Sequence, residues 1–240
     1  MVFQKDLFAH QQVLVTGATQ GIGAGVANYF ADLGARVTAV GLDEGDGSLS
    51  AGVRVVLADV TDPSAVQRVF GGLDSLAALI NCAGIIRRGG AEHQVDVFEQ
   101  VLAVNLTGTM RMCTAARPLL KASGGAIVNT ASMLSFFGGA LVPGYAASKG
   151  GVAQLTKSLA LAYAADKIRV NAVAPGWIAT PLTQALQDDP ERSGTILSRT
   201  PLGRWGTPED VACCVAFLCS PAAAFMTGII LPVDGGYLVA

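Results

Sequence analysis

Short apolar segments alternate with longer helical patterns along the whole chain, and this alternation constrains the fold more than any other feature. The expected strands are residues 12–16, 36–40, 53–57, 76–80, 126–130, 168–173 and 228–231. The expected helices are residues 22–33, 63–70, 95–120, 145–165 and 208–219. Apolar strands that alternate with helices are typical of a parallel sheet covered on both faces. The pattern predicts an α/β fold, with residues 1–240 forming a single domain around a doubly wound parallel sheet of about seven strands.

The connection between the second and third expected strands differs from the others. Residues 41–52 (GLDEGDGSLSAG) contain four glycines, three acidic residues and two serines, which is the composition of a loop. Neighbouring parallel strands are usually joined by a crossover that contains a helix. We therefore expect no helix in this connection and a locally thin cover over one face of the sheet.

The composition excludes several classes of protein. Of the 240 residues, 51% are hydrophobic and only 14% are charged, which excludes a disordered chain. The net charge of −2 argues against a nucleic-acid binder, because such proteins usually carry a basic stripe. Residues 211–233 carry no charge, but Pro221, Gly228 and Pro232 interrupt them. We interpret this segment as a helix, a turn and a strand rather than a membrane span.

The cysteines and histidines indicate the compartment and argue against a metal. The five cysteines show no metal-binding spacing. The number of cysteines is odd, and the first twelve residues contain no apolar run of the kind found in signal peptides. Both observations indicate free thiols in a reducing compartment. The two histidines, His10 and His93, lie far apart in the sequence. We expect a cytoplasmic protein without a metal site or a Ser-His-Asp triad.

A glycine-rich loop follows the first expected strand. Residues 16–23 read TGATQGIG and lead directly into the first expected helix. Glycines allow the backbone to turn tightly and to approach a pyrophosphate. The amides at the start of the helix then point at the phosphates. Because the motif lies between a strand and a helix, it predicts a dinucleotide-binding loop.

A second motif combines a serine, a tyrosine and a lysine. Ser132 follows the strand at 126–130, and ligands of open parallel sheets bind at such strand ends. Tyr145 and Lys149 stand four residues apart, so on a helix their side chains share a face. A free tyrosine has a pKa of about 10, and a neighbouring ammonium group favours its phenolate. The set predicts a general acid/base for an alcohol/carbonyl couple, with Ser132 holding the substrate oxygen.

Together these motifs resemble the short-chain dehydrogenase/reductase family over essentially the whole chain. The family's glycine motif matches residues 16–23, and its serine, tyrosine and lysine match Ser132, Tyr145 and Lys149. Its Asn-Asn-Ala-Gly motif stands at 81–84, where Cys82 replaces the second asparagine. Its helix asparagine, its aspartate after the third strand and its Pro-Gly pair match Asn105, Asp59, Pro175 and Gly176. The resemblance implies a Rossmann-type fold.

The resemblance also implies a mechanism based on hydride transfer. Tyr145 would be the acid/base, Lys149 would bind the nicotinamide ribose and lower the pKa of Tyr145, and Asn105 would complete a proton relay. The implied cofactor-binding residues are Gly17, Thr19, Gln20, Gly21, Ile22, Gly23, Asp43, Asp59, Val60, Asn81, Ala83, Gly84, Tyr145, Lys149, Pro175, Gly176, Ile178 and Thr180. Two of the residues keep a structural alternative: Asn105 as a kink in its helix, and Asp59 as the cap of the next helix.

The choice between NAD and NADP is made after the second strand in this family. The usual acidic position is Gly41 here, and Asp43 follows two residues later. A basic residue would favour a 2′-phosphate, but residues 40–52 contain no lysine or arginine, and the glycine motif holds Gln20. We expect NAD as the cofactor, with NADP less favoured.

Local stretches point to a substrate class. Residues 83–88 (AGIIRR), 131–139 and 203–206 (GRWG) are similar to the sugar-acid branch of the family, the 2-deoxy-D-gluconate and keto-deoxy-uronate 3-dehydrogenases. Arg87 or Arg88 would meet a substrate carboxylate there, or else lie in a solvated loop or an ion pair between subunits. Residues 180–183 (TPLT) depart from the branch, which carries asparagines at this place. We expect residues 181–199 to form a mobile flap over the substrate.

The sequence therefore predicts an oxidoreductase that interconverts a secondary alcohol and a ketone, acting on a sugar acid or a similar small hydroxy compound. One alternative is a 3-oxoacyl-carrier-protein-type reductase. An alternative of another class is a non-catalytic dinucleotide-sensing protein on the same fold. The charge-poor carboxy-terminal third and the resemblance imply a homotetramer, with a dimer as the second choice.

Overall fold

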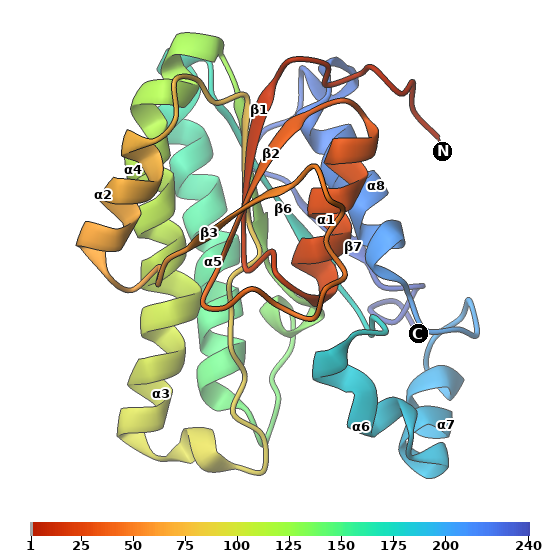
Figure 1. Ribbon diagram of the computed structural model, residues 1–240. Helices are drawn as coiled ribbons and strands as arrows, with labels where there is room; N and C mark the ends of the chain where they lie inside the picture. Colours follow the sequence, from red (N-terminus) through yellow and green to blue (C-terminus); the bar gives the residue numbers. More distant parts are fainter. Residues whose placement is uncertain (1) are drawn as a thin grey trace.

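The computed structural model describes residues 2–240, which contain one seven-stranded sheet with all strands parallel (Figure 1). The strands are β1 Gln12–Thr16, β2 Arg36–Gly41, β3 Arg54–Leu57, β4 Ala78–Asn81, β5 Ala126–Thr130, β6 Arg169–Pro175 and β7 Ile230–Val233. Their order across the sheet is β3-β2-β1-β4-β5-β6-β7. The chain winds outward in both directions from β1 and β4, so the predicted doubly wound sheet is confirmed. Ligands of such sheets bind at this switch point, beyond the carboxyl ends of the strands.

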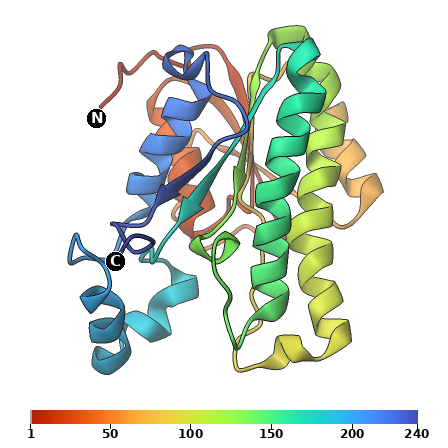
Figure 2. The same ribbon diagram turned by 180° about the vertical axis from the view of Figure 1, so that it is seen from behind.

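Helices cover both faces of the sheet (Figure 1 and, from behind, Figure 2). One face carries α1 Gly21–Asp32 and α8 Pro208–Cys219; the other carries α2 Pro63–Gly71, α4 Thr109–Ser123 and α5 Pro143–Tyr163. Successive residues of a strand point to opposite faces. Accordingly, Val13 and Val15 of β1 pack in the core under α1 and α8, whereas Leu14 packs in the core under α4 and α5. All three side chains are buried, which explains why the centre of β1 is apolar at three successive positions.

Two predicted boundaries are wrong for identifiable reasons. The helix expected at 95–120 is three elements: α3 Val95–Leu102, a π-helix at Ala103–Gly108, and α4. A π-helical turn is a short insertion within an otherwise continuous helix, and residues 103–108 carry no separate sequence signal for it. The fourth strand begins at Ala78 rather than at residue 76, and it extends to Asn81. The remaining predicted elements are present, and their ends agree with the prediction or shift by one or two residues.

The loop between β2 and β3 contains no helix, as predicted; every residue from 41 to 52 is described. Asn28 of α1 holds the loop with its amide group: its Nδ2 donates to the Ser48 oxygen at 2.8 Å, and its Oδ1 accepts from the Ser50 amide at 2.8 Å. The edge strand β3 remains poorly covered, since Val55 is 37% exposed and Leu57 is 56% exposed. The cover over this end of the sheet is therefore thin, as expected.

The uncharged segment 211–233 lies in α8, in a short 3₁₀ turn and in β7, which confirms the interpretation as helix, turn and strand. Within residues 2–240, none of the helices is both long enough and apolar enough to cross a membrane. The same residues contain no group of three or more His, Cys, Asp or Glu side chains arranged to hold a metal ion.

Candidate active site

The glycine loop joins the carboxyl end of β1 to α1 at the switch point of the sheet. Gly17 and Gly21 have φ angles of +59° and +57°, which side chains other than glycine rarely adopt. A Cβ at Gly17 would lie 2.7 Å from the backbone of Ala83, and a Cβ at Gly23 would lie 2.0 Å from the Gly17 oxygen. The loop thus needs glycines for its turns and for its close contact with the segment after β4.

The start of α1 leaves backbone donors free for an anion. Its N-cap, Gln20, makes no side-chain capping hydrogen bond, and the first turn contains no acidic residue. The first N–H groups of a helix have no partner within the helix and attract negative charge. A Cβ at Gly21 would lie 3.5 Å from the Thr180 side chain, so the segment after β6 faces this helix start. These residues fit the pyrophosphate of a dinucleotide.

Asn81 is the last residue of β4 and Ala83 follows it two residues later, but the Asn81 side chain faces the interior. Its Nδ2 donates to Asn129 Oδ1 at 2.9 Å and to Cys113 Sγ at 3.3 Å. Ala83 instead faces the glycine loop, since its amide donates to Thr16 Oγ1 at 3.2 Å. Any contact of Asn81 with a cofactor would therefore come from its main chain.

Lys149, Asn105 and Gly84 meet at one place. A Cβ at Gly84 would lie 3.3 Å from Asn105 Oδ1 and 3.6 Å from Lys149 Nζ. Lys149 is buried, and this burial lowers its pKa to about 8. Asn105, which lies in the π-helix, accepts from the Ile85 amide at 2.7 Å; its Nδ2 donates to the Ile85 oxygen at 2.9 Å and to Ser148 Oγ at 3.0 Å. Single-turn π-helices are frequent at functional sites.

Ser132 and Tyr145 face each other across the carboxyl end of β5. Ser132 caps a short 3₁₀ turn, with its Oγ accepting from the Leu134 amide at 3.2 Å. Burial raises the pKa of Tyr145; the Ser132 hydroxyl and the Arg88 charge act in the opposite direction, and Glu92 raises the pKa further.

Lys149 is not among the groups that shift the pKa of Tyr145 in this structure, so the expected lowering of that pKa by Lys149 stays a prediction. Lys149 Nζ lies 5.6 Å from the centroid of the Tyr145 ring, but it donates to the Thr130 oxygen at 2.6 Å. Burial disfavours the charged form of both groups. The cation that favours the phenolate here is Arg88.

Glu92 is a site residue that the sequence analysis missed. It is 1% exposed; Oε1 accepts from the Arg87 amide and Oε2 from the Tyr145 amide, both at 2.7 Å. Its partners are backbone groups far apart in the sequence, so no motif marks it. Arg88 from the same loop donates to the Leu182 oxygen at 3.4 Å, which brings the segment expected as a flap beside it.

The acidic residues proposed for the adenosine end hold their own loops. Asp59 Oδ1 accepts from the Thr61 amide at 2.7 Å, while the N-cap of α2 is Asp62. The alternative of Asp59 as the cap of that helix is therefore wrong. Asp43 Oδ1 accepts from the Gly45 amide at 2.9 Å. Val60 after β3 is buried, and a Cβ at Gly108 would lie 2.7 Å from its Cγ2.

β6 ends at Pro175, and the chain continues through Gly176, Ile178 and Thr180. A Cβ at Gly176 would lie 2.7 Å from Asp234, so glycine permits this crossing with the carboxy-terminal segment. Thr180 caps the 3₁₀ turn Pro181–Thr183. Residues 184–198 then form two short helices that the sequence analysis missed, α6 Gln184–Gln187 and α7 Pro190–Ser198. Asp189 followed by Pro190 is the local signal that would have predicted the start of α7.

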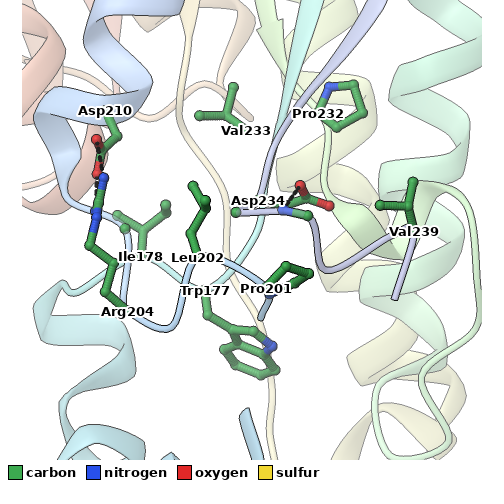
Figure 3. A pocket seen from close by; sticks show the side chains of 13 residues that line it. Trp177, Ile178, Pro201, Leu202, Arg204, Asp210, Pro232, Val233, Asp234 and Val239 are labelled. Carbon is green, nitrogen blue, oxygen red and sulfur yellow. Dashed lines mark hydrogen bonds and ion pairs between the residues drawn. The ribbon is translucent and has the colours of Figure 1, made fainter. Parts of the chain in front are cut away.

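A cavity of about 460 Å³ lies beside this segment (Figure 3). Trp177, Ile178 and Leu202 line it, and the ion pair between Arg204 and Asp210 borders it at 2.7 Å. Ser132, Tyr145 and Lys149 are not part of its lining. The polar groups that can carry out chemistry therefore lie at the strand ends rather than in this cavity.

Comparisons with known proteins agree with this geometry. The family model described as enoyl-(acyl carrier protein) reductase matches residues 17–238. A 2-dehydro-3-deoxy-D-gluconate 5-dehydrogenase from Pseudoalteromonas atlantica is 39% identical over 240 aligned residues, which cover 94% of each chain. A cis-4-hydroxycyclohexanecarboxylate dehydrogenase from Sinomonas cyclohexanicum is 41% identical, and the match covers 97% of this chain and 98% of the relative.

A solved structure shares the whole fold. It is a candidate 2-deoxy-D-gluconate 3-dehydrogenase from Agrobacterium tumefaciens with bound NADP, 40% identical to this chain with a TM-score of 0.90. The match covers 99% of this chain and 100% of the other. Because the family model and these relatives span nearly the entire chain, the protein belongs to the short-chain dehydrogenase/reductase family, as its motifs predicted.

Proposed function

We propose that the protein interconverts a secondary alcohol and a ketone on a sugar acid or a similar small hydroxy acid, with a nicotinamide dinucleotide as the second substrate. The observation that carries the proposal is the meeting of Ser132, Tyr145, Lys149 and Asn105 at the carboxyl ends of β4 and β5, next to the glycine loop. A protein that only senses dinucleotides does not need this set of groups together.

The cofactor fits the residues present. The uncapped start of α1 and the glycines at 17, 21 and 23 would hold its pyrophosphate, and Ile178 and Thr180 would face its nicotinamide end. When bound, the nicotinamide accepts a hydride during oxidation and donates one during reduction.

The side chains of this protein carry the proton. During oxidation, the Tyr145 phenolate accepts the proton of the substrate hydroxyl group, while the Ser132 hydroxyl holds the same substrate oxygen. During reduction, the Tyr145 hydroxyl returns a proton to that oxygen. Lys149 would bind the nicotinamide ribose, and Asn105 would support the loop beside it. Because burial raises the pKa of Tyr145, oxidation becomes faster as the pH rises toward that pKa.

Arg88 supports an anionic substrate. It lies close enough to Tyr145 to lower the pKa of that residue, and its guanidinium contacts the segment at 181–199. A guanidinium in this position binds a carboxylate with two parallel hydrogen bonds. We therefore propose Arg88 rather than Arg87 as the carboxylate partner, and residues 181–199 as a flap that closes over the substrate.

For the cofactor we propose a preference for NAD. The loop at 41–52 carries Asp43, Glu44 and Asp46 and no basic residue, so it would repel a 2′-phosphate. The bound NADP in the Agrobacterium structure argues the other way. The ratio of kcat/KM for NAD and NADP decides the question, and a higher value with NADP would contradict the preference.

We also propose a cytoplasmic homotetramer, with a dimer as the second choice. The five cysteines are free thiols. Phe225 and Leu161 are 105% and 83% exposed, and a contact between subunits would cover these two apolar side chains. Light scattering at micromolar concentration measures the oligomeric state, and a monomer would contradict the proposal.

The test of the function is a turnover screen of hydroxy acids, polyols, keto acids and 3-oxoacyl thioesters, each with NAD and NADP. We expect turnover with a hydroxy acid, and turnover only with a thioester would favour the acyl reductase. Replacing Tyr145→Phe should reduce kcat at least about 10³-fold while nucleotide binding is retained. Full turnover by this variant, or nucleotide binding without any turnover by the unmodified protein, would refute the proposed function.

A further inference from the structure

Glu92 is a buried acidic side chain in the short 3₁₀ turn Ala91–His93. Glutamate is rarely fully buried, and a buried carboxylate needs hydrogen-bond donors. Each of its two oxygens receives one: the Arg87 amide donates to Oε1 and the Tyr145 amide donates to Oε2, both at 2.7 Å. One side chain thus joins the loop that carries Arg88 to the helix that carries Tyr145.

The contact with Tyr145 replaces a missing helix cap. The N-cap of α5 is Val142, which has no side-chain acceptor, and Pro143 is the first helical residue. The Tyr145 amide is therefore one of the unpaired donors at the start of the helix. Glu92 accepts from it and places a negative charge at the positive end of the helix dipole. A Cβ at Gly144 would lie 3.3 Å from Glu92 Oε2, so glycine at this position leaves room for the carboxylate.

The contact with Arg87 fixes the loop on the other side. Asn105 pairs with both the amide and the oxygen of Ile85, and Glu92 holds the Arg87 amide two residues later. The backbone is thus held on both sides of Ile86 and directly before Arg88. These two anchors determine the backbone position from which the Arg88 side chain extends.

We propose that Glu92 is a positioning residue that sets the distance between the Arg88 guanidinium and the Tyr145 hydroxyl, and so matches an anionic substrate to the proton-transfer group. The inference rests on the proposed function and identifies Glu92 as the residue that fixes the relative position of its two key groups. A substrate whose carboxylate is bound by Arg88 then presents its hydroxyl carbon to Tyr145 in one orientation. Misplacement of about 1 Å between such groups costs up to about 100-fold in rate.

Glu92 also acts on Tyr145 through its charge. Ionisable groups from several elements surround the phenol: Arg88 on the loop, Lys149 on α5 and Glu92 on the 3₁₀ turn. Glu92 raises the pKa of Tyr145 and Arg88 lowers it. Removing the Glu92 charge should therefore lower the pH at which oxidation is half-maximal, an effect that a purely structural residue would not produce.

Two variants test position and charge. Glu92→Gln keeps the length of the side chain and removes its charge, but its NH₂ group cannot accept from the second amide, so one anchor is lost as well. Glu92→Asp keeps the charge and is too short to reach both amides. Glu99→Gln is the control, because Glu99 is an exposed acidic residue on the adjacent helix α3. For each variant, kcat and KM are measured against pH, with gluconate as the anionic probe and galactitol as the uncharged probe.

We expect Glu92→Gln to move the pH midpoint of oxidation downward, and Glu99→Gln to leave it unchanged. We expect Glu92→Asp to keep the midpoint within about 0.3 pH units. The same variant should reduce kcat/KM about 10- to 100-fold for gluconate and several-fold less for galactitol. If Glu92→Gln does not fold, the difference between the two probes in Glu92→Asp decides alone.

The inference is overturned if the midpoint of Glu92→Gln equals that of the unmodified protein, or if Glu92→Asp affects both probes equally. Failure of the proposed function gives a different result. In that case Tyr145→Phe retains turnover, or the unmodified protein binds the nucleotide and turns over none of the compounds in the screen.

Discussion

Lys149 Nζ donates a 2.6 Å hydrogen bond to the main-chain oxygen of Thr130, the last residue of β5. The contact ties α5 to the strand end two residues before Ser132. It also keeps an amino group in a buried place, where the pKa of Lys149 falls to about 8. The buried position of this side chain therefore destabilises its charged, ammonium form relative to the neutral amine.

The variant Lys149→Met should lack the part of the pH dependence of the free energy of unfolding that Lys149 contributes. In the unmodified protein, folded Lys149 loses its proton at a pH of about 8, and the unfolded chain keeps that proton up to about pH 10.4. Between these values the unfolded state binds more protons, so this residue makes stability rise with pH, by about 3 kcal/mol in total. Denaturant unfolding at pH 7 and pH 10 gives the free energy of unfolding of the variant and of the unmodified protein. Their difference measures the effect of Lys149, because the pH dependence from the buried cysteine thiols is common to both proteins and cancels. A difference that does not change with pH would contradict it.

Gly41 should not tolerate even a methyl group. A Cβ there would lie 2.4 Å from Thr19 Cγ2 and 2.5 Å from Thr19 Oγ1. We expect Gly41→Ala to destabilise the protein by about 1–3 kcal/mol through overpacking. Adding Thr19→Ala should recover most of the loss, and a double-mutant cycle by thermal unfolding measures this coupling. Strictly additive effects would show that the two side chains do not compete for this space.

Asn105 and Asn28 each hold two backbone groups; Asn105 does so in the interior, and Asn28 does so at the surface. Asn105→Ala would leave the partly buried amide and oxygen of Ile85 without partners, at a cost of about 2–3 kcal/mol. Asn28→Ala would release Ser48 and Ser50 into water, at a cost of about 1 kcal/mol. Chemical denaturation of both variants provides the comparison. Equal losses would contradict the role of burial.

Asp210 should stabilise the protein above the acid range. The Arg204 guanidinium donates to both of its oxygens, at 2.7 and 2.9 Å, and holds its pKa well below the usual range. A carboxyl group with a lowered folded pKa adds stability above its unfolded pKa, and this stability is lost as the pH falls through the acid range. We expect Asp210→Asn to cost about 1 kcal/mol at pH 7, a modest value because the pair is partly solvated. The difference should shrink toward pH 3, and a constant difference would exclude the ion pair as its source.

The strands, their parallel arrangement and the glycine loop could be predicted because local pattern determines them. A run of apolar residues such as the centre of β1 is buried on both faces of the sheet. Gly17 and Gly21 are glycines because the turns that they form require positive φ angles. Ser132, Tyr145 and Lys149 were found because two of them are neighbours on one helix.

Other features depend on contacts that the sequence does not display. Glu92 meets amides 5 and 53 residues away. The orientation of Asn81 toward Asn129 depends on the register of β4 with β5, which pairs these residues directly. The lowered pKa of Lys149 follows from its burial within the folded site. Each of these features becomes visible only when the elements are packed together.

The π-helix at Ala103–Gly108 has a consequence for the length of the chain. A π-helical turn contains one residue more than an α-helical turn, and one residue corresponds to about 100° of rotation around the axis. The extra residue therefore allows Val101 of α3 and Met112 of α4 to be buried while Asn105 between them points at Ile85. In this segment the number of residues is as important as their identity. A family member shortened here by one residue would have to give up either the core contact of α4 or the orientation of the asparagine.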